Sequence, residues 1–300
     1  MQNKTERGGE IHSQTEKEVA PMFGTENLAN KETLVMIHGM WGWPGYWEKY
    51  RRVFGEKGFT CITPTLPYHN VKPNDPPHPK LGNTSIADYV ADVKRQIEQE
   101  RLEEKPILIG HSVGGLISML LASQGVAKAV VALSPAPPRG IMPLTFFGRQ
   151  SKFGLRTATY WSWWKKPQRL TPEEAKIMMF NLLPPEEQEE NCRNIRWDSG
   201  RAMFEVGMSL FDTKKATKVD VEKISCPMLI VAGQKDQCVP LSVLRKTAKK
   251  FGKIADYWEL ENHGHWIMGE PGWERIAEDI YQWLQKKLEK EKEEKGRIFA

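Results

Sequence analysis

Short runs of aliphatic and β-branched residues recur along the chain, and most of them are apolar at nearly every position. They occupy residues 33–39, 59–64, 106–112, 129–135, 227–236 and 255–262. Strands that are buried on both faces of a parallel sheet have this pattern, because neither face meets water. The pattern therefore predicts six strands in one mostly parallel sheet.

Amphipathic helical patterns lie between these runs. Residues 85–102, with Thr84 or Ser85 as N-cap, place five apolar side chains on one face: Ile86, Tyr89, Val90, Val93 and Ile97. Residues 270–288, with Pro271 near their start, present a second such face: Trp273, Ile276, Ile280, Trp283 and Leu284. Strands that alternate with helices predict βαβ units, so we expect an α/β fold whose central sheet is flanked by helices.

The region between 136 and 227 interrupts this alternation. A structureless loop of that length is uncommon in a compact domain, and helical patterns recur near 172–182, 186–195 and 199–213. We interpret the interruption as a helical insertion, a lid or cap. The predicted organisation is a flexible N-terminal arm (1–30), an α/β core (31–138 and 219–290), a helical cap (139–218) and a charged C-terminal tail (291–300).

Composition narrows the functional classes. The net charge of +5 is mild and not gathered in one block, so we expect no nucleic-acid partner. No apolar run reaches the ~18 residues of a membrane span, and the N-terminus lacks the apolar core of a signal peptide. We therefore expect a cytoplasmic protein. The scattered cysteines suit free thiols: Cys61, Cys192, Cys226 and Cys238. The sequence leaves a homodimer open.

The third apolar run leads directly into GHSVGG (110–115), which a helical pattern follows. This is a G-x-S-x-G motif at a strand-to-helix turn, where a serine in a strained backbone conformation projects its hydroxyl above the sheet. Side chains in place of Gly110 and Gly114 would collide with the neighbouring strand and helix. Ser112 is the candidate nucleophile; the alternative is a serine with a purely structural role.

A serine hydroxyl needs a base to become a nucleophile, and the base needs a group to orient it. Asp236 follows the strand that ends in LIVAGQKD, and His265 follows the next strand, in the stretch ENHGHW. No carboxylate follows the strand that ends in ALSPAP, which favours Asp236 over an acid there. Asp236 could otherwise be an ordinary turn residue, and His263 is the alternative base.

The oxyanion that develops in such a reaction needs hydrogen-bond donors. The backbone N–H of Val113, directly after the serine, is one candidate. The backbone N–H of Met40, in the loop HGMWGWPGYW (38–47), is the other. We expect His38 to hold this loop by hydrogen bonds and not to transfer protons, and we assign no proton transfer to His111.

The chain resembles the α/β-hydrolase superfamily, in particular small-molecule esterases and lipases with a helical cap. The resemblance spans residues 32–290 and rests on four motifs in order: HGMWGWPGYW, GHSVGGL, GQKDQCVP and NHGHWIMGEP. It implies that the apolar runs are the third to eighth strands of that fold, that 139–218 is the cap, and that the triad is Ser112, Asp236 and His265.

Tryptophans gather around these motifs, where they could form an aromatic substrate pocket or pack in the core. The pocket candidates are Trp41, Trp43, Trp161, Trp164 and Trp266. No lysine or arginine stands out as a clamp for an anionic group, which favours an uncharged, hydrophobic ester as substrate. We expect a serine carboxylesterase without metal or organic cofactor.

Three alternatives remain open. The same fold and triad also serve thioesterases, C–C hydrolases, lyases, acyltransferases and perhydrolases. A metal enzyme could use the pair His263 and His265, although zinc requires at least three ligands and no other histidine or cysteine lies nearby in a ligand-like spacing. A non-catalytic binding protein of this fold is the third, although such proteins typically lose one of the triad residues.

Overall fold

The computed structural model describes residues 32–141 and 162–298. The predicted N-terminal arm (1–30) therefore lies outside the described residues. A parallel sheet of six strands forms the centre, in the spatial order β2-β1-β3-β4-β7-β8. Its strands are β1 (Thr33–Ile37), β2 (Thr60–Ile62), β3 (Ile107–His111), β4 (Ala129–Leu133), β7 (Met228–Gly233) and β8 (Ala255–Leu260). Each predicted apolar run contains one of them.

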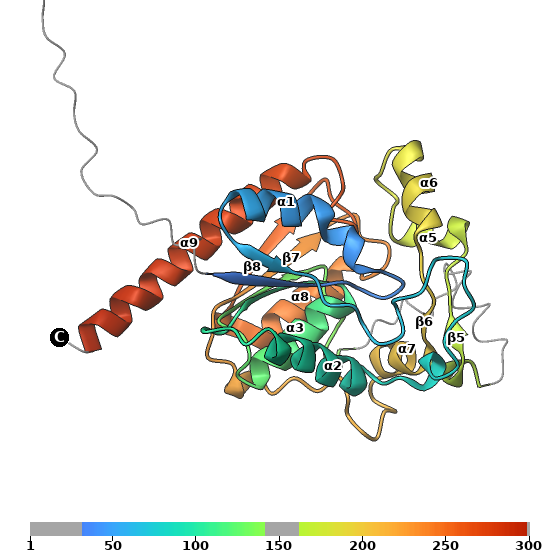
Figure 1. Cartoon of the computed structure of the whole chain (residues 1–300), viewed down its shortest axis with the longest axis horizontal. Helices are drawn as coiled ribbons and strands as arrows, with labels where there is room; N and C mark the ends of the chain where they lie inside the picture. The colour runs from blue at the N-terminus through green and yellow to red at the C-terminus, as the bar shows by residue number, and fades with distance from the viewer. Residues whose placement is uncertain (1–31, 142–161, 299–300) are drawn as a thin grey trace, which may run out of the picture.

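Helices cover both faces of the sheet (Figure 1): α1 and α9 pack on one face, and α2, α3 and α8 on the other. Their bounds are α1 (Glu48–Glu56), α2 (Ile86–Gln99), α3 (Val113–Ser123), α8 (Leu241–Phe251) and α9 (Trp273–Ile298). Single 3₁₀ turns complete the core: η2 (Pro44–Trp47), η3 (Leu81–Asn83), η5 (Val221–Lys223) and η6 (Gly252–Ile254). The α/β fold predicted from the sequence is confirmed.

Burial explains why the strand pattern is readable in the sequence. Every residue of β3, β4 and β7 is buried, whereas the edge strands β2 and β8 are only partly covered. The five apolar residues predicted for the inner face of α2 are the ones buried there. Ser85 is its N-cap, and Ser85 and Asp88 form a capping box that satisfies backbone N–H groups at the helix start.

The chain between β4 and β7 leaves the sheet, and we refer to residues 162–218 as the inserted segment. It gathers near the ends of the strands from which the loops after β1 and β3 emerge (Figure 1). It contains η4 (Trp163–Lys165), β5 (Pro167–Gln168), α5 (Pro172–Met178), α6 (Pro185–Arg193), β6 (Asp198–Ser199) and α7 (Gly200–Gly207). β5 and β6 pair with each other and not with the central sheet.

Candidate active site

Ser112 lies at the turn between β3 and α3 with φ 53° and ψ −118°, which is uncommon for a residue with a side chain. Hydrogen bonds on both sides hold this conformation. The Ser112 amide donates to the Leu133 carbonyl on the neighbouring strand (3.0 Å), and the Ser112 carbonyl accepts from Ala136 (2.9 Å) and Leu116 (3.2 Å). Strained residues that are held in this way cluster at functional sites.

The two motif glycines permit the close packing around this turn. A Cβ at Gly110 would lie 2.2 Å from the carbonyl oxygen of Gly114, in helix α3. A Cβ at Gly114 would lie 2.1 Å from the carbonyl oxygen of Ile37, on strand β1. Any larger residue would therefore push the helix away from the strands, as the sequence predicts.

Asp236 and His265, which are 29 positions apart, come together beyond the ends of β7 and β8. His265 Nδ1 donates to Asp236 Oδ2 (2.9 Å), and both side chains are buried. The other oxygen, Oδ1, accepts from the backbone amides of Cys238 and Val239 (2.7 Å each). The carboxylate is thus fixed in orientation, and it fixes the imidazole with the proton on Nδ1.

The electrostatics at His265 depend on this pairing. Burial alone would lower the pKa of His265, but the negative charge of Asp236 outweighs it and holds that pKa well above its ordinary value. The neighbouring His111 ring lies 4.7 Å from the His265 ring. Burial and the nearby His265 hold the pKa of His111 well below its ordinary value, and its Nε2 donates to the His265 carbonyl (2.8 Å). His111 is therefore neutral and supports the backbone of its neighbour.

A narrow cavity of about 30 Å³ opens beside Ser112. Its walls include the candidate nucleophile, both candidate oxyanion donors and two residues of α7. The lining residues are Met40, Trp41, Ser112, Val113, Ala136, Pro137, Met203, Val206, Cys238 and Val239. Neither the Met40 amide nor the Val113 amide donates a hydrogen bond to another residue within 32–141 and 162–298. Both predicted oxyanion donors thus border one cavity with the serine.

The backbone around Met40 is held by His38. The Gly39 carbonyl accepts from His38 Nδ1 (2.9 Å) and from the Gly42 amide (3.2 Å). The carbonyl and the N–H of a trans peptide point in opposite directions, so these bonds turn the Met40 N–H to the other side of the loop. His38 Nε2 accepts from the Leu66 amide (3.3 Å), and burial lowers the pKa of His38 to about 3. A neutral His38 thus positions the loop.

The predicted pocket tryptophans have different surroundings. Trp41 lines the cavity, and Trp161 lies outside the described residues. Trp43 lies under the Arg196 guanidinium (5.0 Å), and Trp164 packs against Phe204 and its neighbour Trp163. Trp266 is buried among three rings, those of Tyr46, His111 and Phe180. Of the described four, only Trp41 is among the lining residues.

Glu270 is a residue of the site that the sequence analysis did not single out. It is fully buried, and its carboxylate accepts from the amides on both sides of His265: Gly264 (2.7 Å) and Trp266 (3.1 Å). His263 Nδ1 also lies 3.3 Å from it. The two histidines of ENHGHW therefore contact different carboxylates, and Glu270 fixes the loop that carries His265. Glu270 stands directly before Pro271 in the motif NHGHWIMGEP, and this position is the sequence signal that could have identified it.

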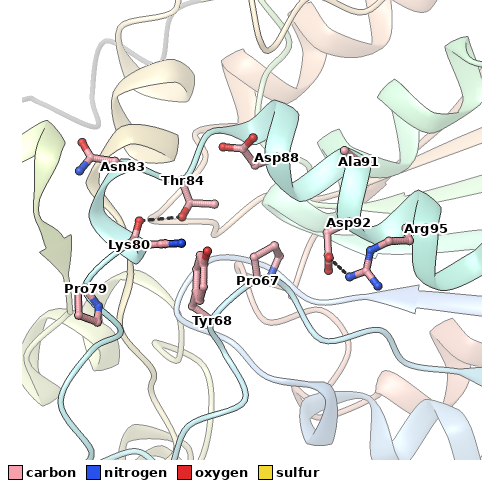
Figure 2. Close-up of a pocket in the computed structure, with 10 residues that line it drawn as sticks. All are labelled: Pro67, Tyr68, Pro79, Lys80, Asn83, Thr84, Asp88, Ala91, Asp92 and Arg95. Carbon is pink, nitrogen blue, oxygen red and sulfur yellow. Dashed lines mark hydrogen bonds and ion pairs between the residues drawn. The ribbon is translucent and has the colours of Figure 1, made fainter.

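A larger hollow of about 740 Å³ lies elsewhere, between the loop after β2 and helix α2 (Figure 2). Its acidic residues already have partners: Asp88 accepts from the Ser85 amide, and Asp92 pairs with Arg95. Figure 2 also shows the Thr84 hydroxyl bonded to the Lys80 carbonyl. None of the candidate catalytic residues lines this hollow, so size alone does not identify the site.

Comparison with known families agrees with the fold and the motifs. The sequence profile described as "Alpha/beta hydrolase family" matches residues 34–278. The chain belongs to this family. No curated protein matches the sequence.

Several solved structures of alpha/beta hydrolases share the fold. A monoacylglycerol lipase from Paleococcus ferrophilus is 24% identical, with 85% of this chain and 94% of that chain covered and a TM-score of 0.62. A pyrethroid hydrolase from Sphingobium faniae is 20% identical (86% and 99% covered, TM-score 0.62). A methylesterase from Arabidopsis is 14% identical (85% and 99% covered, TM-score 0.63). At these identities the likeness establishes the architecture.

In the two described ranges, 32–141 and 162–298, no helix has the length and apolar character that crossing a bilayer requires. The same ranges hold no group of three or more His, Cys, Asp or Glu side chains arranged to bind a metal ion.

Proposed function

We propose that the protein is a serine hydrolase that cleaves carboxylic esters of uncharged, hydrophobic small molecules. One observation carries the proposal: Ser112 in its strained turn borders the same cavity as the loop of Cys238 and Val239, whose amides fix the Asp236–His265 pair. The candidate nucleophile and the loop that orients the candidate acid and base thus border one small space.

The reaction follows from these positions. His265 takes the proton of the Ser112 hydroxyl as its oxygen attacks the ester carbonyl, and the amides of Met40 and Val113 stabilise the oxyanion. The tetrahedral intermediate collapses, His265 returns the proton to the departing alcohol, and an acyl-enzyme remains. Water, activated by the same histidine, then releases the acid. Asp236 orients the imidazole and stabilises its positive charge.

The lining of the cavity supports the substrate class. No Asp, Glu, Lys, Arg or His is among its described lining residues, so a charged acyl or alcohol group would find no ionic partner among them. The cavity volume of about 30 Å³ is far below the ~300 Å³ of a typical ligand pocket. Substrate entry therefore requires its walls to separate. Since Met203 and Val206 of α7 form part of the wall, we propose that residues 139–218 act as a cap.

Covalent labelling tests the proposed function directly. A fluorophosphonate should modify the protein at one site, detected as a single mass increment and mapped by peptide sequencing to Ser112. The Ser112→Ala variant should remain unlabelled, whereas Ser118→Ala should label like wild type, because Ser118 only bonds to the Gly114 carbonyl within α3. Labelling of the Ser112→Ala variant, or ester turnover undiminished in it, would contradict the proposal.

The pH dependence of the reaction should reflect the paired histidine. Only neutral His265 can accept the serine proton, and the Asp236 charge holds the pKa of His265 well above its ordinary ~6.5 despite its burial. We therefore expect kcat/KM for an uncharged ester to rise with pH through a midpoint above ~6.5 and to fall tenfold per pH unit below it. A midpoint at or below ~6.5 would contradict the raised pKa, and a rate that stays constant throughout the histidine range and below it would argue against His265 as the base.

A further inference from the structure

The carboxylate of Asp198, on β6 of the inserted segment, is fully buried and accepts four hydrogen bonds. The donors are Trp41 N (2.8 Å), His69 Nε2 (3.0 Å), Tyr89 Oη (2.7 Å) and Ser199 N (2.7 Å). They belong to the loop after β1, the loop after β2, helix α2 and β6 itself. One carboxylate thus joins the inserted segment to three parts of the core.

His69 carries a positive charge in this arrangement. Its Nε2 faces Asp198 Oδ2, and its Nδ1 lies 2.9 Å from the Pro67 carbonyl. A carboxylate and a carbonyl can only accept, so both ring nitrogens must carry protons. Burial alone would lower the pKa of His69, but the charge of Asp198 outweighs it and raises that pKa. His69 and Asp198 therefore form a completely buried ion pair.

The inserted segment holds Trp41 from both sides. The Trp41 amide donates to Asp198 Oδ2, and the Trp41 carbonyl accepts from the Arg196 amide (2.9 Å). Trp41 has φ 58°, a left-handed conformation that is uncommon for an aromatic residue and that its surroundings must maintain. Trp41 directly follows Met40, so the peptide that joins them is fixed by Asp198.

We infer that Asp198 is a positioning residue of the oxyanion hole. By holding the Met40–Trp41 peptide, it fixes the chain on the C-terminal side of Met40. The Met40 N–H, which belongs to the preceding peptide, is thereby kept where the oxyanion develops, and so the inserted segment supplies part of the catalytic geometry. His69 compensates the buried negative charge that this task requires. The inference rests on the proposed function, because it assigns Asp198 a role in the same reaction.

Glu205 offers a matched comparison. It is also a fully buried carboxylate of the inserted segment, and it binds the start of α2 through the Ser85 hydroxyl (2.9 Å) and the Ile86 amide (2.7 Å). Arg201 donates to it from within α7 (2.7 Å). Glu205 thus attaches the inserted segment to the core without contacting the loop after β1. If buried carboxylates there serve stability alone, Asp198 and Glu205 should be equivalent in kinetics.

The test compares Asp198→Ala and Glu205→Ala by thermal unfolding and by steady-state kinetics on a p-nitrophenyl ester. Both variants should unfold at lower temperature. Asp198→Ala should lower kcat about 10- to 100-fold with KM within about threefold, because a displaced oxyanion donor weakens transition-state binding and not substrate binding. Glu205→Ala should keep kcat within about twofold. The rate of fluorophosphonate labelling should fall in Asp198→Ala in parallel with kcat.

Equal kcat values in the two folded variants, or a loss in Asp198→Ala confined to KM, would overturn the inference. If Asp198→Ala does not fold, the double variant Asp198→Leu/His69→Phe replaces the buried ion pair with apolar side chains, a change that proteins often tolerate. It still removes the acceptor for Trp41, so the same loss of kcat is expected. A wild-type protein that neither labels at Ser112 nor turns over esters overturns the proposed function itself.

Discussion

Replacing His265 with alanine should lower kcat/KM for an ester by about 10⁵-fold or more, whereas His263→Ala should change it by less than about threefold. Loss of the base of a serine hydrolase costs nearly as much as loss of the serine, because the two act as one unit. His263 makes a 3.3 Å contact with Glu270, whose carboxylate keeps its bonds to Gly264 and Trp266 without it. The loop therefore retains its shape in His263→Ala.

The two histidine variants are each other's control, since they share one loop and one substitution. Both are measured by initial rates on the same ester, with circular dichroism to verify the fold. A loss in His263→Ala that equals or exceeds the loss in His265→Ala would reassign the base. If KM rises in His265→Ala and kcat does not fall, His265 does not transfer the serine proton.

The sheet was predictable from the sequence because its centre excludes water on both faces. Strands β3, β4 and β7 are buried at every position, and such strands need apolar residues throughout. Helix α2 was predictable for the complementary reason, since its buried positions recur at helical spacing. Helix α1 was not proposed from the pattern. Only Tyr50 and Phe54 are buried along it, which is too few to define a face.

The ends of the elements were less predictable than their presence. The helical pattern at 199–213 corresponds to α7, which ends at Gly207, and the pattern at 270–288 corresponds to α9, which extends from Trp273 to Ile298. Apolar spacing stops where a helix leaves the core, although the helix itself can continue in water. Local signals therefore locate the buried part of a helix and not its full length.

The supporting carboxylates show why part of the site was hidden from sequence reasoning. Asp198 and Glu270 act through backbone amides, and an amide has no signature in the side-chain sequence. Asp198 lies 157 positions from its partner Trp41, on a strand of two residues. Motif spacing located Ser112, Asp236 and His265 as candidates, but the residues that hold their surroundings become visible only in three dimensions.

Asp236→Asn should lower kcat by about 10⁴-fold, because it should reverse the proton positions on the base. The amides of Cys238 and Val239 point at one oxygen of this side chain, so an asparagine must place its own oxygen there. Its NH₂ group then faces His265 Nδ1, which can only accept from it. The proton of the neutral imidazole moves to Nε2, and the nitrogen that should receive the serine proton is already occupied.

The pH profile separates this effect from a loss of fold. The carboxylate of Asp236 is what raises the pKa of His265 against its burial, so without it the pKa falls. The residual kcat/KM of Asp236→Asn should therefore rise through a midpoint at lower pH than in wild type. Asp220→Asn provides the control, since Asp220 pairs with Lys218 and Lys223 at the surface. Equal midpoints in wild type and Asp236→Asn would mean that a group other than Asp236 orients His265 and raises its pKa.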